Sequence, residues 1–265
     1  MKSEAFNMDC LEYMRTLPDN AFDLAVCDPP YGDGLHAEDG GGKGWFTKYN
    51  QKAPESEYNK SRSQTVQVER EREAQPLWQS GEQVREVQAV TRTGGTWAER
   101  YGKKIIAWDV APEKEYFDQI FRVSRNQIIW GGNYFALPPT RCFLVWRKLT
   151  ISESFTMAMA EYAWTSFNSN AKVFECAPQG KPDDPRFHPT QKPIDLYRWI
   201  FNLYAEPGQT IFDPYLGSGS SRIAAWEAGL DFVGCEIDPI YFEKQEERFE
   251  RHTAQMNLFT IGGEL

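Results

Sequence analysis

The pattern of apolar and polar residues along the chain predicts alternating strands and helices. Apolar runs of strand length end abruptly at polar or turn residues, and amphipathic stretches of helical length lie between several of them. The predicted strands are residues 22–27, 128–130, 210–213 and 231–236, and the predicted helices are residues 11–17, 113–123, 195–204, 221–228 and 242–251. This alternation is typical of an α/β fold, in which helices cover both faces of a mostly parallel sheet.

Two further runs, residues 142–146 and 156–164, predict neighbouring antiparallel strands at one edge of that sheet. A length of 265 residues fits one α/β domain with an insertion. We therefore expect a single domain over residues 1–265, interrupted by the segment 33–104 and followed by a tail at residues 253–265.

Asp28-Pro29-Pro30-Tyr31 ends the first strand and combines groups that can hold a planar ring with an amino group. The Asp28 carboxylate and the Pro29 carbonyl oxygen are two acceptors for the two amino hydrogens, and Tyr31 offers a stacking face. A ring amino group is a poor nucleophile because its lone pair is delocalised, and fixed acceptors favour a more pyramidal nitrogen. An ordinary Asp pKa of about 3.9 makes Asp28 an acceptor rather than a strong base. The structural alternative is a proline turn that only closes the strand.

A second pattern predicts a strand, a glycine turn and a helix at residues 210–221. Asp213 ends the strand, and the turn Gly217-Ser218-Gly219 lets a ligand approach the backbone at a helix N-terminus. Glu236 follows about 20 residues later, where nucleotide-binding α/β folds carry a ribose-binding carboxylate. No third glycine and no Lys-Ser/Thr follow, so neither NAD nor a phosphate-loop nucleotide is favoured.

Together the two patterns resemble the S-adenosylmethionine-dependent amino-methyltransferases that act on DNA bases. The tetrapeptide precedes the glycine loop, which is similar to the β class of these enzymes, whose motif order is circularly permuted. Protein-glutamine methyltransferases carry a related Asn-Pro-Pro-Tyr, but their glycine loop comes first. The resemblance covers about residues 5–31 and 105–245. It implies a Rossmann-like methyltransferase fold with a mostly parallel seven-stranded sheet, an antiparallel edge hairpin, and S-adenosyl-L-methionine as cofactor.

The resemblance also assigns roles to individual residues. Asp9, next to Cys10, is implied to border the adenine of the cofactor, and Thr190 and Lys192 its methionine end. The implied catalytic set is Asp28, Pro29, Pro30 and Tyr31. The implied cofactor-binding set is Asp9, Cys10, Asp28, Thr190, Lys192, Asp213, Gly217, Ser218, Gly219 and Glu236.

Three other residues near these motifs are weaker candidates. His188 begins the segment that contains Thr190 and Lys192, and a loop histidine is more often an ordinary residue than a ligand. Tyr134 and Phe135 follow the strand at residues 128–130. They are either walls of the target-base pocket or core aromatics, and the core interpretation is slightly favoured.

Residues 33–104 lie outside the resemblance. The segment contains Gly40-Gly41-Gly42, is rich in Gln and Glu, and has aromatic residues at positions 45, 46, 49, 58, 78, 97 and 101. It is either a target-recognition region that folds against DNA or a lid that is disordered without DNA. Little chain separates the hairpin from Pro193, so we place target recognition in the insertion.

The composition of the chain limits which partners and surroundings the protein can have. A net charge of −9 argues against a protein that coats DNA electrostatically, although a local basic cleft is compatible with it. Candidate basic positions are residues 92–104 together with Arg141, Arg147 and Lys148. Five cysteines without a Cys-x-x-Cys pair indicate reduced thiols in a cytoplasmic protein, and three scattered histidines suggest no metal site. No apolar run is long enough to span a membrane.

The expected function is site-specific methylation of the N6 amino group of adenine in double-stranded DNA, with the base flipped out of the duplex. Asp28 favours adenine because the similar cytosine enzymes more often carry Ser at that position. Methylation of N4 of cytosine is the alternative, and an RNA target stays open. An alternative of another class is a catalytically silent DNA- or clamp-binding protein on the same fold.

The chain end carries a separate pattern, Gln255-Met256-Asn257-Leu258-Phe259. It is similar to the Gln-x-x-Leu-Phe peptide with which bacterial replication and repair proteins bind the sliding clamp, where Leu-Phe fills an apolar pocket. The alternative is that Leu258 and Phe259 pack onto the sheet. We expect a monomer or homodimer of bacterial or phage origin, either an orphan methylase or part of a restriction–modification system.

Overall fold

The computed structural model describes residues 1–31, 110–151, 158–178 and 184–261. Residues Met1–Tyr31 and Val110–Leu265 belong to one compact unit. The predicted insertion at residues 33–104, with its two interpretations and its basic stretch at residues 92–104, lies outside the described residues. No helix in the described part is long and apolar enough to cross a membrane.

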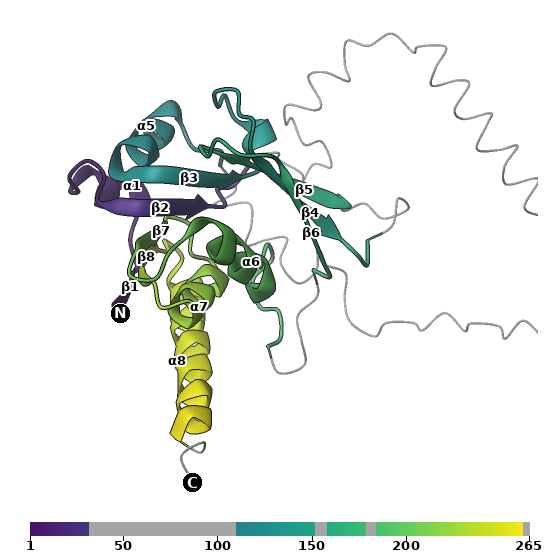
Figure 1. The fold of residues 1–265 in the computed structure, drawn as a ribbon. Helices are drawn as coiled ribbons and strands as arrows, with labels where there is room; N and C mark the ends of the chain where they lie inside the picture. Colours follow the sequence, from purple (N-terminus) through teal and green to yellow (C-terminus); the bar gives the residue numbers. More distant parts are fainter. Residues whose placement is uncertain (32–109, 152–157, 179–183, 262–265) are drawn as a thin grey trace, which may run out of the picture. The chain divides into compact units, whose positions relative to one another are not determined.

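The predicted alternation of strands and helices is confirmed (Figure 1). The strands are β1 (Ser3–Phe6), β2 (Phe22–Cys27), β3 (Ser124–Trp130), β4 (Phe143–Lys148), β5 (Ala160–Thr165), β6 (Lys172–Cys176), β7 (Thr210–Asp213) and β8 (Asp231–Cys235). The α-helices are α1 (Cys10–Arg15), α5 (Lys114–Val123), α6 (Ile194–Tyr204), α7 (Ser220–Glu227) and α8 (Pro239–Ile261), and a 3-10 helix, η1, spans Gly132–Tyr134.

The eight strands form one sheet in the order β1-β8-β7-β2-β3-β5-β4-β6. All neighbouring pairs are parallel except those of β5, which runs antiparallel to both β3 and β4. The predicted β4–β5 hairpin is therefore present. The sheet has one strand more than the expected seven, because β6 pairs with the outer side of β4 and forms the edge in its place.

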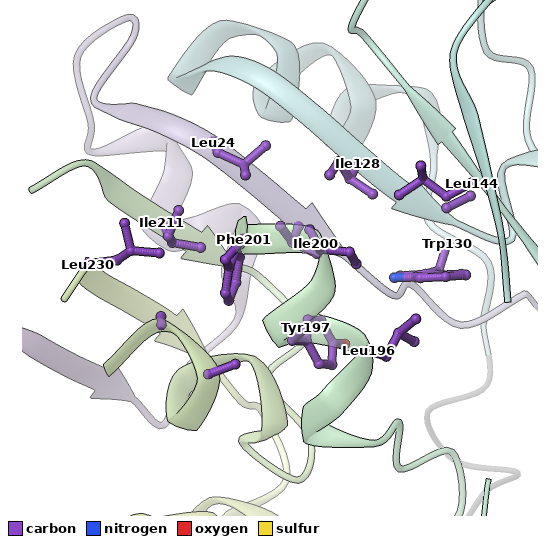
Figure 2. Close-up of a cluster of buried hydrophobic side chains, with 14 of the residues drawn as sticks. Leu24, Ile128, Trp130, Leu144, Leu196, Tyr197, Ile200, Phe201, Ile211 and Leu230 are labelled. Atoms are coloured by element: carbon purple, nitrogen blue, oxygen red, sulfur yellow. The ribbon is translucent and has the colours of Figure 1, made fainter. Parts of the chain in front are cut away.

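One face of the sheet is covered by α6 and α7. Alternate residues of β2, such as Leu24 and Val26, point to this face and pack with Ile200 and Phe201 of α6. Figure 2 shows Leu24, Ile200 and Phe201 of this cluster between the strands and α6. Full burial of one such side chain contributes roughly 1.5–3 kcal/mol to folding, so this cluster fixes α6 and the loop before it on the sheet.

The opposite face is covered by α1 and α5. The intervening β2 residues, Ala25 and Cys27, point to this side and pack with Met14 of α1 and Ile120 of α5. Because β2 buries both of its faces, its sequence is continuously apolar from Leu24 to Cys27 rather than alternating. All five cysteines are free thiols, and four of them are buried.

The last helix is longer than predicted. α8 runs from Pro239 to Ile261 instead of ending near Arg251, so residues 255–259 are helical and the predicted tail at residues 253–265 begins inside the helix. The sequence explains the difference, because residues 252–261 contain neither Gly nor Pro, and Gly262-Gly263 come only after them. A final strand over Leu258-Phe259 is therefore excluded.

Candidate active site

The predicted site residues follow strands that are neighbours in the sheet. Asp28 comes directly after β2, Asp213 ends β7 and Glu236 comes directly after β8, in the sheet order β8-β7-β2. Because these strands are parallel, their carboxyl ends lie at one edge of the sheet. Ligands of open α/β sheets bind at that edge. The fold therefore brings the two sequence motifs together, although Asp28 and Asp213 are 185 positions apart in the chain.

The Asp28 carboxylate is bound on both oxygens. The Tyr31 hydroxyl donates to Oδ1 at 3.2 Å, and the Lys192 ammonium donates to Oδ2. The Asp28 side chain is 15% exposed. Burial raises the Asp28 pKa, and Lys192 opposes that shift. Burial also raises the Tyr31 pKa, so its hydroxyl stays protonated and remains a donor.

The Tyr31 ring lies against the turn that follows β3. Tyr134 stacks on Tyr31 with 4.6 Å between ring centroids, and Phe135 approaches edge-on at 6.2 Å. Gly131 has φ +65°, and a Cβ there would lie 2.1 Å from the Tyr31 ring. Tyr134 is 39% exposed, so the core interpretation is wrong for Tyr134, whereas Phe135 does pack at the margin of the α1/α5 cluster.

Hydrogen bonds to the Asp213 carboxylate fix the two ends of the glycine loop. The Asp213 carboxylate accepts from the Tyr215 backbone N–H at 3.0 Å and from the Ser221 hydroxyl at 2.5 Å. Burial raises the Asp213 pKa to about 7. Asp213 therefore ties the end of β7 to the first turn of α7, and the loop Tyr215–Gly219 spans the gap between them.

Glu236 closes the loop from the side of β8. Its Oε2 accepts from the Gly217 N–H at 2.8 Å and its Oε1 from the Asp238 N–H at 2.9 Å. Gly217 and Gly219 have φ of +52° and +73°, conformations that glycine adopts without strain. Each Glu236 oxygen keeps a further lone pair, so the carboxylate can still accept from a ligand hydroxyl.

Asp9 is placed at the N-terminus of α1. Its Oδ1 accepts from the backbone N–H groups of Leu11 and Glu12, at 2.8 and 3.0 Å, which makes Asp9 a helix cap. Cys10, the first residue of α1, is buried, and burial raises its pKa to about 12. Cys10 therefore remains a neutral thiol.

The segment before α6 joins both motifs. The His188 ring packs beside Gly217, 3.4 Å from where a Cβ would be, and its Nδ1 accepts from the Thr190 N–H at 3.3 Å. Burial lowers the His188 pKa to about 3, so the ring is neutral. Lys192, expected beside the cofactor, has its ammonium on Asp28 and lies 5.4 Å from the Trp130 ring centroid.

Three further charged residues near the site lie outside the motifs. Glu161 of β5 contacts Lys192 and Lys148, and Arg248 of α8 donates to the Ser218 carbonyl oxygen of the glycine loop at 2.7 Å. The sequence suggested that Lys148 belongs to an exposed basic cleft. In the structure Lys148 is instead buried and forms an ion pair with Glu161. Glu161 is the one charged residue of β5, a signal that could have singled it out.

The other two suggested basic positions are also engaged. Arg147 pairs with Glu175 at 2.7 Å, and Arg141 donates to the Asn170 side chain at 2.7 Å. Among the described residues, no cluster of three or more His, Cys, Asp or Glu side chains could hold a metal ion.

The residues at this edge fit a nucleoside-bearing cofactor. A turn of two positive-φ glycines, a buried helix N-terminus at Ser220 and a carboxylate after the neighbouring strand are present together. Such a set offers backbone N–H groups and an acceptor for hydroxyl groups.

Comparison with known families decides what this site belongs to. A model of the DNA methylase family matches residues 41–247, which include Lys192, the glycine loop and Glu236. The chain belongs to the DNA methylase family. The methylase is a DNA methyltransferase of the N6/N4 amino-methyltransferase group. Asp28–Tyr31 precede the matched range, so their assignment rests on the tetrapeptide and its position.

The methylase is also similar to individual proteins. It is 25% identical over 256 residues to the type II methyltransferase M2.MboI from Moraxella bovis, covering 92% of this chain and 86% of that protein. Among solved structures, PvuII DNA methyltransferase, described as cytosine-N4-specific, aligns with a TM-score of 0.49 and 12% identity, covering 97% and 93% of the chains. The M1.HpyAVI–SAM complex aligns with a TM-score of 0.42 and 16% identity, covering 93% and 98%.

Proposed function

We propose that this methylase transfers a methyl group from S-adenosyl-L-methionine to the exocyclic N6 amino group of adenine in DNA. The observation that carries the proposal is the pairing of the Asp28 carboxylate with the stacked Tyr31 ring, at the sheet edge that also holds the glycine loop. Family membership supports methyl transfer to DNA. The choice of adenine rests on Asp28 at the first motif position.

The target adenine lies flipped out of the duplex, with its ring against Tyr31 and its amino group at Asp28. Base–aromatic stacking contributes about 1–3 kcal/mol, which offsets part of the unstacking cost of a few kcal/mol. The Asp28 carboxylate and the Pro29 carbonyl oxygen accept the two amino hydrogens and direct the nitrogen lone pair away from the ring plane. Pro30 keeps this turn stiff because its φ is fixed.

The cofactor supplies an electrophilic methyl group on a sulfonium, which leaves as a neutral thioether. Gly217, Ser218 and Gly219 would let it approach the backbone, and Glu236 would accept hydrogen bonds from its ribose hydroxyl groups. Asp9, next to Cys10, would border its adenine, and Thr190 and the Lys192 backbone would border its methionine end. Asp213 holds the loop at which it would bind. After transfer the amino nitrogen carries one proton too many, and the Asp28 carboxylate, as the proposed acceptor of the amino hydrogens, would take it. Proximity and orientation carry much of the rate.

Expression in a methylation-free bacterial host, followed by genome-wide mapping of modified bases, tests the proposal. We expect N6-methyladenine at one short sequence, and no modification with Asp28→Ala. N4-methylcytosine in the digested nucleosides would establish the alternative base. Cofactor binding without methylation of any DNA would favour a catalytically silent DNA- or clamp-binding protein.

Target recognition is assigned to residues 33–104. The described chain between β5 and α6 is short and contains β6, which leaves little room for a recognition domain there. Deleting residues 50–100 should abolish sequence-selective methylation while cofactor binding persists. An unchanged site preference in the deletion variant would reject this assignment.

Residues Gln255–Phe259 are assigned to binding of the bacterial sliding clamp, on the strength of the Gln-x-x-Leu-Phe spacing. A pull-down with the clamp should recover the methylase but not the double variant Leu258→Ala/Phe259→Ala. Equal recovery of both proteins would reject clamp binding and leave the methyltransferase proposal untouched.

A further inference from the structure

Four charged side chains form a row that ends at Asp28. In order they are Asp28, Lys192, Glu161 and Lys148, so negative and positive groups alternate. The Lys148 ammonium lies 2.5 Å from Glu161 Oε1, and the Lys192 ammonium lies 3.3 Å from Glu161 Oε2 while donating to Asp28. The two lysine side chains are only 6% and 4% exposed, so water cannot readily replace their partners.

The two acceptors on either side of Lys192 are not used equally. Asp28 Oδ2 receives a hydrogen bond from the lysine, whereas Glu161 Oε2 is buried and has no hydrogen-bond partner among the residues that the structure describes. A buried acceptor without a hydrogen bond is costly. Glu161 therefore offers Lys192 a second acceptor, which is already ion-paired with its ammonium at 3.3 Å and to which a short movement would bring a hydrogen bond.

A target amino group that arrives at Asp28 meets a carboxylate that already has two partners. In the structure, Tyr31 occupies Oδ1 and Lys192 occupies Oδ2, so both carboxylate oxygens already accept hydrogen bonds. An incoming amino group competes with an ammonium held by a charge-assisted hydrogen bond, which is among the strongest that proteins make. Target binding is easier if the ammonium can move to another carboxylate.

We propose that Lys192 is a displaceable cap on Asp28, and that Glu161 is the positioning residue that receives the Lys192 ammonium when the target amino group binds. The inference rests on the proposed role of Asp28 as acceptor of that group. Lys148 fixes Glu161 through Oε1 and leaves Oε2 facing Lys192. No covalent bond changes in the exchange. The free enzyme keeps its buried carboxylate paired, and the complex keeps its buried ammonium paired.

The test compares single variants on a duplex that carries the mapped recognition sequence. Glu161→Gln removes the receiving charge, so the single-turnover methylation rate at saturating cofactor should fall about tenfold or more. The fluorescence rise of 2-aminopurine at the target position should shrink in parallel, while the cofactor Kd changes less than about twofold. Glu175→Gln is the matched control, because Glu175 forms an exposed ion pair with Arg147. If the Gln variant does not fold, Glu161→Asp withdraws the carboxylate by one methylene and serves the same comparison.

The double variant separates this role from simple structural support. In a Lys192→Met background there is no ammonium to receive, so adding Glu161→Gln should cause no further loss of rate. An equal loss in both backgrounds, or an unchanged rate for Glu161→Gln alone, would overturn the inference. The variant Asp28→Asn separates failure of the proposed function from failure of the Lys192 exchange. Full activity of that variant rejects the proposed function itself. Its inactivity beside a fully active Glu161→Gln variant rejects only the exchange.

Discussion

The ring of Tyr31 occupies the space in which any side chain at Gly131 would begin, with Cε1 2.1 Å from the position of a Cβ. Tyr31 belongs to the tetrapeptide after β2, and Gly131 begins the turn after the neighbouring strand β3. The orientation of the proposed stacking ring therefore depends on the absence of a side chain from another part of the chain.

Gly131→Ala should displace the Tyr31 ring and reduce methylation more than it reduces stability. The left-handed backbone costs an alanine about 1–2 kcal/mol, and the clash adds to it. We expect a methylation rate at least about tenfold lower, since small misplacements near the reacting groups are costly. Gly229→Ala is the matched control, because Gly229 has φ +71° and nothing within 4 Å of its Cβ position. That variant should lose only the backbone cost of about 1–2 kcal/mol and keep its activity. Equal activity in the two variants would contradict the prediction.

Asp213→Asn should change how stability depends on pH. Burial raises the Asp213 pKa to about 7, so the folded protein binds this proton more tightly than the unfolded chain does. The resulting stabilisation is complete below the ordinary Asp pKa of about 4 and is lost as the pH rises through about 7. Denaturant unfolding should show the Asp213→Asn variant gaining stability relative to the wild type as the pH rises from about 5 to about 7. If the difference in stability between the two proteins stays constant over that range, the pKa of Asp213 is not raised.

His188→Gln should change the pH dependence of stability in the opposite direction to Asp213→Asn. The His188 pKa is lowered to about 3, first by burial and then by Arg186 and Lys192, so folding requires the neutral ring. A depressed pKa of a base costs stability as the pH falls below its ordinary value of about 6.5, down to about 3. The wild type should therefore lose stability relative to the Gln variant on acidification from about pH 7 to about pH 5, measured by chemical denaturation. The same acid dependence in both proteins would assign it to other groups.

Arg248→Met should weaken cofactor binding through the glycine loop. Arg248 is 2% exposed, donates to the Ser218 carbonyl oxygen at 2.7 Å and pairs with Asp184 at 2.5 Å. Removing it leaves these acceptors without their partner, at a cost of about 2–4 kcal/mol of stability. Calorimetric titration should show cofactor affinity lower by about tenfold. Arg251→Met, at an exposed position of the same helix, should change neither quantity.

The sequence predicted the sheet well because its central strands bury both faces. The continuous apolar run of β2 and the run of β7 need no partner to be recognised, and the residues directly after such strands meet at one edge. Asp28, Asp213 and Glu236 could therefore be placed together. β6 was missed because its residues alternate between partly buried and exposed, as expected for an edge strand with one covered side.

The contacts among the charged side chains could not be predicted from the sequence, for a different reason. Lys192 meets Asp28 across 164 positions of chain, and Glu161 meets Lys148 only because β5 reverses direction beside β4. Spacing within one segment carries no information on such pairs. The resemblance placed Lys192 next to the cofactor, whereas the structure buries its stem and places its ammonium between the carboxylates of Asp28 and Glu161.

The strand order determines when the sheet can form during synthesis of the chain. Within the described part of the chain β1 pairs with β8 alone, and β2 lies between β3 and β7. The first strands to be synthesised can therefore pair only after the last ones are made. The Lys2 N–H meets the Asp231 side chain across 229 positions of chain. A nascent chain that has completed the Asp-Pro-Pro-Tyr segment still lacks the strands that flank it. The edge of the sheet that carries the proposed site is therefore complete only after β7 and β8 have left the ribosome.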